Sequence, residues 1–447
     1  SPDECRSVAE SLDFTLNLGS MSVKAYTFSG TEPSELVSSD GIHVGLVGLL
    51  WDSAEDMISL DIKDLYLGKP RRGKLPELVT GDVGTALKNK FTRRTVVGKV
   101  AGVFDPVGLV TPITSRFKLN LHDLCRLNLD WDDQIPDSYL ECWVKNLTDI
   151  QGLREVRFRR SVIPPDAVNT DVQLITSVDA SEKIAIAVVH SRVLLKSGNY
   201  HTQLVCAKSK LVSMSTVPRA ELKAATMGAV LNHTAKLNFG SQYTKSIFVT
   251  DSTVVLYWIN QDQRPLQTAV RNCVIEIRRF TQVEQWFHVE THLNIADLGT
   301  RNAEIEDIQT GSDWQQGKEW MKLKQDEMPL RTLDEITMTS EERRIAAQET
   351  KAPDIAGVVL SNLITKVGDR YSFSKYLVDP CIMSWPKSVR ILAYVFRFLS
   401  RIAPNHQNYR RKILGTALRR TEPETPENVE PEIKDLQLAT DEIEFAE

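Results

Sequence analysis

The sequence lacks paired cysteines and long apolar segments. Its six cysteines are spread over 447 residues without any C-x-x-C pair. This pattern argues against a disulfide framework and a four-ligand zinc site, and it favours a reduced, intracellular compartment. The longest apolar runs, at residues 44–51 and 391–396, fall far short of the roughly 20 residues that a membrane helix needs. We therefore expect no membrane partner, and the acidic start at residues 1–4 is not typical of a signal peptide.

Net positive charge is also missing, which at first argues against a nucleic-acid partner. The chain holds 54 Lys and Arg against 59 Asp and Glu, a net charge of -5. However, residues 387–420 contain nine basic residues and no acid, whereas residues 421–447 contain ten acids and one lysine. High charge and interspersed prolines predict that this acidic tail is disordered. Residues 1–420 then carry +4, so the net charge does not exclude nucleic acid.

Hydrophobic periodicity divides the rest of the chain into segments. A helix over residues 3–17 and strands over 42–51, 57–62 and 65–67 indicate part of a sheet. Apolar residues at helical spacing, starting with Thr92 as a cap, predict a small helical unit over residues 82–151. The next block begins with three predicted strands, at residues 172–179, 183–189 and 201–208. A helix that starts at residue 218 follows, and then come a strand at 246–250, two helical stretches and a strand at 285–291. This order predicts an α/β fold in which a mixed sheet has helices on its faces. Residues 332–353 are polar and predict a linker.

Four acids stand out by their position in these elements. Asp179 closes a predicted strand, and Asp251 follows another. Glu221 lies near the start of a helix, on the same face as the small residues Ala225 and Gly228, which would let that face pack closely on a sheet. Asp297 opens a short helix after the last strand. Strand ends and helix starts could therefore bring the four carboxylates together.

Clustered carboxylates repel one another unless divalent cations lie between them. Such a cluster predicts two Mg²⁺ ions, with Mn²⁺ as an alternative, that activate water for in-line attack on a phosphodiester. Each acid also has an ordinary structural interpretation. Asp251 could cap the helix at residues 252–259, and Asp297 lies three residues after Asn294, as in a capping box. Asp179 could be a turn residue, and Glu221 a charge favoured by the helix dipole.

An ordered series of motifs resembles the ribonuclease H domain of BEL/Pao-type retrotransposon polyproteins. The motifs are SVDAS (177–181), AKSK (207–210), VPRAEL (217–222), TDS (250–252) and NIADL (294–298). Upstream, GLLWD (48–52) is similar to the last strand of that family's reverse transcriptase palm, and VFDPVGLVTP (103–112) to the hallmark after the palm. Residues 314–320 and RILAYVFRF (390–398) are similar to the stretch before integrase.

The resemblance implies a ribonuclease H-like mixed five-stranded sheet, preceded by a partial reverse transcriptase palm and a helical thumb or connection. The implied domains are a palm remnant (1–81), the helical thumb or connection (82–153) and the ribonuclease H-like domain (154–322). A linker and pre-integrase region (323–386), a basic helical segment (387–420) and the acidic tail (421–447) follow. The family's metal-binding acids fall on Asp179, Glu221, Asp251 and Asp297. The implied activity is Mg²⁺-dependent cleavage of the RNA strand of an RNA:DNA hybrid, chosen by its 2′-hydroxyls and shape.

Further residues are candidates for contacts with the hybrid. His292, in the loop before the acidic helix, could relay protons or help product leave, although a surface loop histidine is the more common interpretation. Ser252 beside Asp251, and Arg271 or Asn272 on the next helix, could contact the hybrid or form a solvated polar face. Basic residues of the helical unit predict a surface that follows phosphates without reading sequence, including Arg93, Arg94, Lys99, Arg116 and Lys118. The family pattern is broken by Ile295, where proline is usual, and by Asn302, where glycine is usual.

Other motifs of such polyproteins are missing from the sequence. No Tyr-x-Asp-Asp motif is present, so we expect no polymerase activity, and without an Asp-Thr-Gly or Asp-Ser-Gly triplet we expect no peptidase activity, although related regions carry a peptidase label. The expected partners are the hybrid and the remainder of the Pol polyprotein, namely palm, fingers and integrase. The expected location is the cytoplasm, including virus-like particles, with the nucleus as an alternative. The competing hypothesis is a non-catalytic or domesticated remnant that binds nucleic acid without cutting it.

Overall fold

The computed structural model describes most of the first 350 residues. It describes residues 2–23, 26, 28–29, 43–46, 48–67, 77–78, 91–212, 216–262 and 266–350. The chain divides into two compact units, residues 1–351 and 352–447. The second unit lies outside the described residues, and with it lie our predictions for residues 351–386, the basic segment 387–420 and the acidic tail. Among the helices that the structure describes, none is long and apolar enough to cross a membrane.

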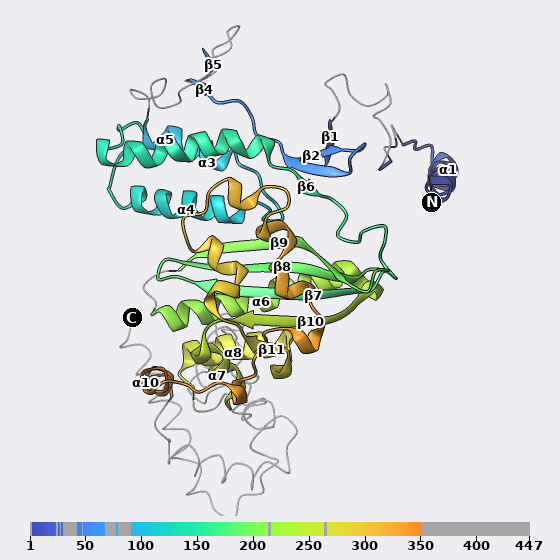
Figure 1. Ribbon diagram of the computed structural model, residues 1–447. Helices are drawn as coiled ribbons and strands as arrows, with labels where there is room; N and C mark the ends of the chain where they lie inside the picture. Colours follow the sequence, from blue (N-terminus) through green and yellow to red (C-terminus); the bar gives the residue numbers. More distant parts are fainter. Residues whose placement is uncertain are drawn as a thin grey trace, which may run out of the picture. The chain divides into compact units, whose positions relative to one another are not determined.

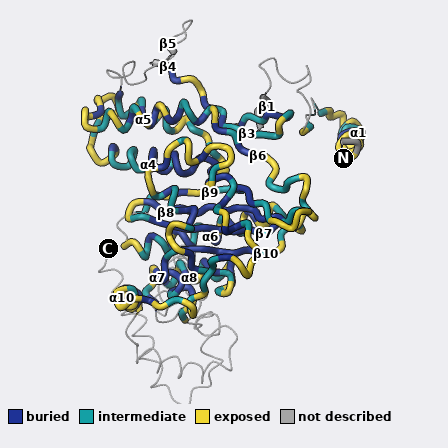
Figure 2. The backbone as a smooth tube through the Cα atoms, in the orientation of Figure 1, coloured by how far each residue is buried: buried dark blue, intermediate teal, exposed yellow. Residues whose placement is uncertain are grey.

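A mixed five-stranded sheet forms the centre of the first unit, as predicted (Figure 1). Its strands are β7 (Val172–Ala180), β8 (Ile184–Leu194), β9 (Tyr200–Leu211), β10 (Tyr243–Thr250) and β11 (Trp286–His288), in the order β11-β10-β7-β8-β9. The pairs β7–β8 and β8–β9 are antiparallel, whereas β10 pairs in parallel with both β7 and β11. The central strands are almost entirely buried (Figure 2), because both faces of the sheet are covered.

Helix α6 (Val217–Phe239) covers one face of this sheet. It begins with Pro218 in its first turn, a position that proline's fixed φ favours, and it ends at Gly240. As the spacing predicted, Gly228 lies against the sheet: a Cβ at this position would come within 2.4 Å of Val178. The helices α7 (Thr253–Asn260) and α8 (Thr268–Phe280) share the hydrophobic core on this side with α6.

The predicted helical unit consists of α3 (Arg93–Ala101), α4 (Thr111–Cys125) and α5 (Asp137–Gly152). Thr92 caps α3 as expected, because its hydroxyl accepts a hydrogen bond from the backbone N–H of Thr95 at 3.3 Å. The helices share one hydrophobic cluster with the second face of the five-stranded sheet. The short helices η1 (Leu153–Glu155), η4 (Thr291–Leu293), η5 (Ile295–Gly299), η6 (Glu306–Ile308), α9 (Asp313–Gln316) and η7 (Glu319–Lys322) complete this side of the fold.

The N-terminal elements form a separate small sheet. Helix α1 (Pro2–Leu18) is followed by β1 (His43–Leu46), β2 (Leu49–Asp52) and β3 (Met57–Leu60), with β6 (Phe158–Arg159) pairing on β3. The strand predicted over residues 42–51 is wrong as a single strand, because Gly48 has a φ of 84° and the chain turns there into a hairpin. A short pair, β4 (Tyr66–Leu67) and β5 (Glu77–Leu78), follows, and residues 82–90 of the helical unit are not described. The assignment of this region to a palm remnant stays a prediction.

The region predicted to be a linker is ordered in its first part. Residues 323–350 contain η8 (Gln325–Glu327), η9 (Leu333–Glu335) and α10 (Ser340–Gln348), and both Thr332 and Thr339 form capping boxes. Met338 and Ala346 are buried in the core beside α7. The guanidinium of Arg219 donates to the carboxylate of Glu349 at 2.7 and 2.8 Å. The linker prediction is therefore wrong for residues 323–350, because apolar and charged contacts distant in sequence hold a polar segment in place.

Candidate active site

The four predicted carboxylates come from four different elements of the fold. Asp179 lies near the end of β7, Glu221 on α6, Asp251 between β10 and α7, and Asp297 in η5. Their charges interact: besides burial, which is the larger cause, Asp251 and Asp297 raise the pKa of Asp179, and Asp251 and Asp179 raise the pKa of Glu221. The side chains that the sequence singled out are thus brought into electrostatic contact.

Asp179 is buried, with 8% of its surface exposed. Burial is the largest cause that raises its pKa, from 3.8 to about 6, and the neighbouring carboxylates add to the effect. The hydroxyl of Thr300 donates to Asp179 Oδ2 at 2.7 Å and acts in the opposite direction. Asp179 is no turn residue, because the hydroxyl of Ser181 accepts the backbone N–H groups of the turn after β7.

Glu221 has a raised pKa as well. Burial is again the largest cause and raises it from 4.5 to about 7, while a hydrogen bond from Ser252 lowers it. The first turn of α6 contains no acid, so Glu221 lies beyond the region where the helix dipole favours negative charge. A carboxylate with no helical role, held among other carboxylates, is typical of a functional site.

Asp251 does not cap helix α7. That role belongs to Ser252, whose hydroxyl accepts the N–H of Val255 at 3.3 Å. The side-chain amide of Asn294 donates to the carbonyl oxygen of Val178 at 3.0 Å and to Asp251 Oδ1 at 3.4 Å. Its oxygen accepts the N–H of Ala296, so Asn294 starts the helix that carries Asp297. The capping role considered for Asp251 thus belongs to Ser252, and the cap of the helix that carries Asp297 is Asn294.

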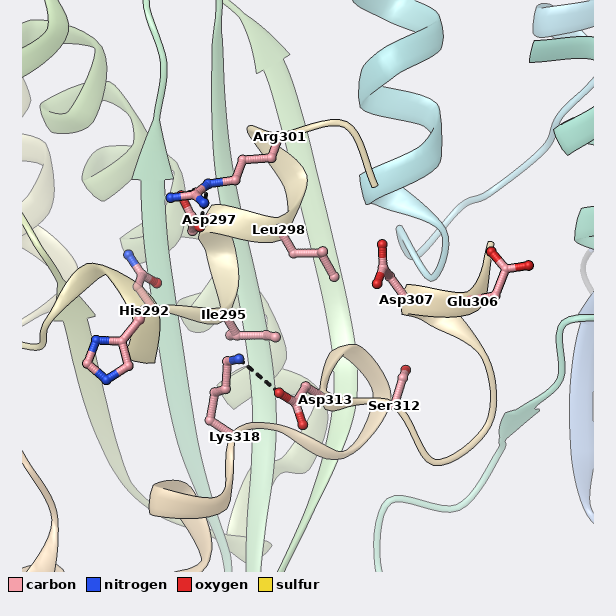
Figure 3. A pocket seen from close by; sticks show the side chains of 11 residues that line it. His292, Ile295, Asp297, Leu298, Arg301, Glu306, Asp307, Ser312, Asp313 and Lys318 are labelled. Carbon is pink, nitrogen blue, oxygen red and sulfur yellow. Dashed lines mark hydrogen bonds and ion pairs between the residues drawn. The ribbon is translucent and has the colours of Figure 1, made fainter. Parts of the chain in front are cut away.

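Asp297 lies at the rim of a pocket of about 410 Å³ between η5 and the segment of η6 and α9 (Figure 3). Arg301, one helical turn later, donates to its carboxylate at 2.9 Å and forms an ion pair at 2.8 Å. On another wall of the pocket Lys318 pairs with Asp313 at 2.8 Å. His292 also lines this pocket, with its Nδ1 3.6 Å from Glu290 and an exposed side chain.

The chemistry of the four acids fits a divalent cation. They offer hard oxygen ligands, and their mutual repulsion is what a cation would remove. As the side chains stand, however, no three His, Cys, Asp or Glu groups in the described part of the chain are gathered closely enough to hold a metal ion. In the same site, the exposed guanidinium of Arg301 pairs with the carboxylate of Asp297.

The other predicted contact residues have varied surroundings. Arg116 was predicted to lie on a phosphate-binding surface, but it is buried and donates to Asp149 and to the carbonyl oxygen of Ala303 at 2.7 Å. That prediction is wrong, because residues distant in sequence cover the helix face that carries Arg116. Ser252 is buried as the cap of α7.

Arg93 and Arg94 both lie over the exposed ring of Trp131. Arg94 also pairs with Asp132 at 2.7 Å. Lys99 is half-buried, which lowers its pKa. On α8, Arg271 is partly buried and Asn272 is exposed. Sequence reasoning missed Thr300, although its spacing of three residues from Asp297 places both on one helix face.

The chain was compared with known proteins. Residues 92–252 match the family model described as the Pao retrotransposon-like RNaseH-like domain. No curated protein matches the chain. Among solved structures, ribonuclease H1 from the halophilic archaeon Halobacterium salinarum NRC-1 is 17% identical, with a TM-score of 0.20, and the match covers 28% of this chain and 90% of that one.

Two foamy viral protease-reverse transcriptase structures also match, each over 56% of this chain with a TM-score of 0.31. The one in complex with double-stranded DNA is 10% identical and covered over 38% of its length; the one in complex with an RNA/DNA hybrid is 12% identical and covered over 29%. This chain therefore spans only 29–38% of the length of these viral proteins. Identities and TM-scores are low, so the family assignment depends on the family model and the motifs. The match of residues 92–252 to the Pao retrotransposon-like RNaseH-like domain confirms the resemblance to a BEL/Pao-type Pol fragment.

Proposed function

We propose that the chain cleaves the RNA strand of RNA:DNA hybrids in a reaction that needs Mg²⁺, with Mn²⁺ as a substitute. One observation carries this proposal: carboxylates from β7, α6, the start of α7 and η5 lie near enough in space for their charges to act on one another. Burial raises the pKa of Asp179 and Glu221 most, Asp251 and Asp297 add to the effect on Asp179, and Asp251 and Asp179 add to the effect on Glu221. Such a group of acids is costly to keep ionised, which is typical of functional sites, and the ribonuclease H-like fold supports a nuclease site in particular.

Asp179, Glu221, Asp251 and Asp297 would hold the metal ions. When bound, the ions would supply a water of lowered pKa and stabilise the leaving oxygen. For Asp297 to take part, Arg301 would have to release its carboxylate. The guanidinium would then be free to contact a phosphate.

The chain's own residues position the carboxylates. Thr300 donates to Asp179 and fixes the direction of its side chain. Asn294 connects Asp251 to the backbone of β7. His292, exposed in η4 before Asp297, could take up or release a proton as product leaves.

The proposed partner is the hybrid, with the palm, fingers and integrase of a Pol polyprotein as further partners and the cytoplasm or nucleus as location. The wide, shallow minor groove of a hybrid presents 2′-hydroxyls on one strand, which supports a choice of RNA over DNA by shape. Asn272, exposed on α8, remains available for such contacts.

A second candidate is a non-catalytic domain that binds nucleic acid. Two observations favour it. Arg301 pairs with Asp297 and so occupies one of the four carboxylates, and no group of three metal-ligating side chains is gathered in the described residues. Cleavage separates the two candidates, because both would bind the hybrid.

The test is cleavage of a labelled RNA:DNA hybrid in Mg²⁺ and in EDTA. We expect wild-type cleavage in Mg²⁺ alone and a loss of at least about a hundredfold in Asp179→Asn, the scale of removing a major catalytic group. Asp171→Asn is the matched control, because Asp171 is an exposed acid just before the same strand. A wild-type protein that binds the hybrid but leaves it intact in Mg²⁺ and in Mn²⁺ would establish the second candidate instead.

A further inference from the structure

A groove of about 770 Å³ follows the edge strand β9, apart from the pocket beside Asp297. One wall is formed by the turn after α3 and the first part of α4, within residues 103–118. The other wall is the second half of α6, within residues 231–239, and residues 205–209 of β9 line the groove between them. Contacts between α4 and β9 and between α6 and β9 hold both walls against the same strand (Figure 1).

The VFDPVGLVTP motif builds the first wall rigidly. The carboxylate of Asp105 accepts the N–H groups of Gly108 and Leu109 at 2.9 and 2.8 Å. The carbonyl oxygen of Val107 accepts the N–H of Ala207 on β9 at 2.9 Å. Gly108 has a φ of 81°, and a Cβ there would lie 1.8 Å from the carbonyl oxygen of Ala207. The motif thus attaches the turn to an edge strand that would otherwise present free backbone groups.

The groove carries excess positive charge. Lys118 donates to the hydroxyl of Ser209 at 2.8 Å and to its carbonyl oxygen at 3.3 Å. Lys208 also lines the groove. Burial lowers the pKa of Lys118, the charge of Asp105 opposes this effect, and the charge of Lys208 adds to it. Among the described residues that line the groove, Asp105 is the only acid, and its carboxylate is occupied by backbone N–H groups. The two lysines outnumber this acid, so the lining keeps a net positive charge that an anionic ligand would neutralise.

Strand register places this charge at a defined distance from the carboxylates. Asp179 is opposite Ile186, and Ile186 is opposite Ser209, so the three residues form one row across the sheet. With strands about 4.8 Å apart, Ser209 lies on the order of 10 Å from Asp179. Each strand of a duplex has one phosphate per about 3.4 Å of axis, so this distance corresponds to roughly three nucleotides.

We propose that the groove along β9 binds the phosphate backbone of a nucleic-acid strand a few nucleotides from the carboxylates, with Lys118 and Lys208 each contacting a phosphate. The proposal depends on the proposed function only for the strand's identity as part of a hybrid. The contacts are independent of base sequence, because ammonium groups recognise phosphate charge. A free nucleotide offers the same chemistry, and the experiment includes it as a separate arm.

The experiment measures binding in EDTA, where the proposed cleavage cannot occur. Fluorescence anisotropy with a 20-base-pair hybrid compares the wild-type chain with Lys208→Glu, Lys118→Met and Lys196→Glu. Lys208 is exposed, so its variant should fold normally, and Lys196 is a matched control, an exposed lysine in the hairpin between β8 and β9. We expect about tenfold weaker binding for Lys208→Glu, a slope of log Kd against log salt reduced by about one for Lys118→Met, and no change for Lys196→Glu.

Equal affinity in all four folded proteins, or no hybrid binding by the wild type, would overturn the groove assignment. ATP is the probe in the second arm. If the wild type binds ATP tightly, and Lys208→Glu loses ATP binding but binds the hybrid unchanged, the ligand of the groove is a free nucleotide and not a nucleic-acid strand. The outcomes are separable from those of cleavage. If the hybrid stays intact with wild-type protein in Mg²⁺ but binds more weakly to the lysine variants in EDTA, the nuclease is refuted and the groove is kept. If the hybrid is cleaved in Mg²⁺ and the lysine variants bind it unchanged in EDTA, the groove alone is refuted.

Discussion

Asp179→Asn should stabilise the metal-free protein at high pH. The carboxyl is buried and its pKa is raised from 3.8 to about 6 in the folded state, so ionisation favours the unfolded chain. The stability cost is absent well below pH 4, grows as the pH rises, and is complete above about pH 7. At about 1.4 kcal/mol for each tenfold change in the ionisation constant, its full size is about 3 kcal/mol. Asparagine removes the charge, and its side-chain oxygen can still accept the hydrogen bond from Thr300.

The assay is urea unfolding in EDTA at pH 5 and pH 8. From the same pKa values, about half of the loss in the wild type's free energy of unfolding is present at pH 5. The amount by which the variant is more stable than the wild type should therefore grow by about 1.5 kcal/mol between the two pH values. Asp171→Asn, which changes an exposed acid, should show no such growth. In Mg²⁺ at pH 8 the advantage should shrink, because a bound cation stabilises the ionised wild type. An advantage that does not depend on pH would refute the electrostatic argument, and one that ignores Mg²⁺ would refute metal binding at Asp179.

Two further predictions concern how the helical unit is attached to the sheet. Gly108→Ala should lower the free energy of unfolding by about 3 kcal/mol or more, since its Cβ would collide with the backbone of Ala207 and Gly108 has a positive φ. A urea midpoint of unfolding equal to that of the wild type would contradict this. Arg116→Met should cost about 3 kcal/mol, because it removes the buried partner of the Asp149 carboxylate and leaves only the half-exposed ammonium of Lys145, 3.6 Å away. The double variant with Asp149→Asn should recover part of that loss, and additive losses would show that the pair is not coupled.

The sequence predicted the sheet and the four acids because both depend on local signals. Strand ends and helix starts are visible as alternation and periodicity. Asp179 lies near the carboxyl end of β7 and Asp251 directly follows β10, and these two strands pair in parallel with each other. The ordinary interpretations of these acids could not be excluded from sequence. Whether Asp251 or Ser252 caps α7 depends on backbone geometry, and the structure gives the cap to Ser252.

The errors come from contacts between distant residues. Arg116 lies on α4 and reads as surface charge, yet its partners Asp149 and Ala303 are 33 and 187 residues away. Likewise, residues 332–350 are polar enough to predict a linker, although two Thr-x-x-Glu capping boxes were visible in the sequence. The pairing of Arg219 with Glu349, 130 residues apart, could not have been read from either segment alone.

The most direct test of the central claim follows each strand of one hybrid separately. With the RNA strand and the DNA strand carrying different labels, wild-type protein in Mg²⁺ should shorten the RNA and leave the DNA intact, while Asp251→Asn should leave both intact. Asp171→Asn should behave as the wild type. Equal cutting of both strands would contradict recognition of RNA, and RNA cleavage that persists in Asp251→Asn and Asp179→Asn would contradict the assignment of the carboxylates as the active site.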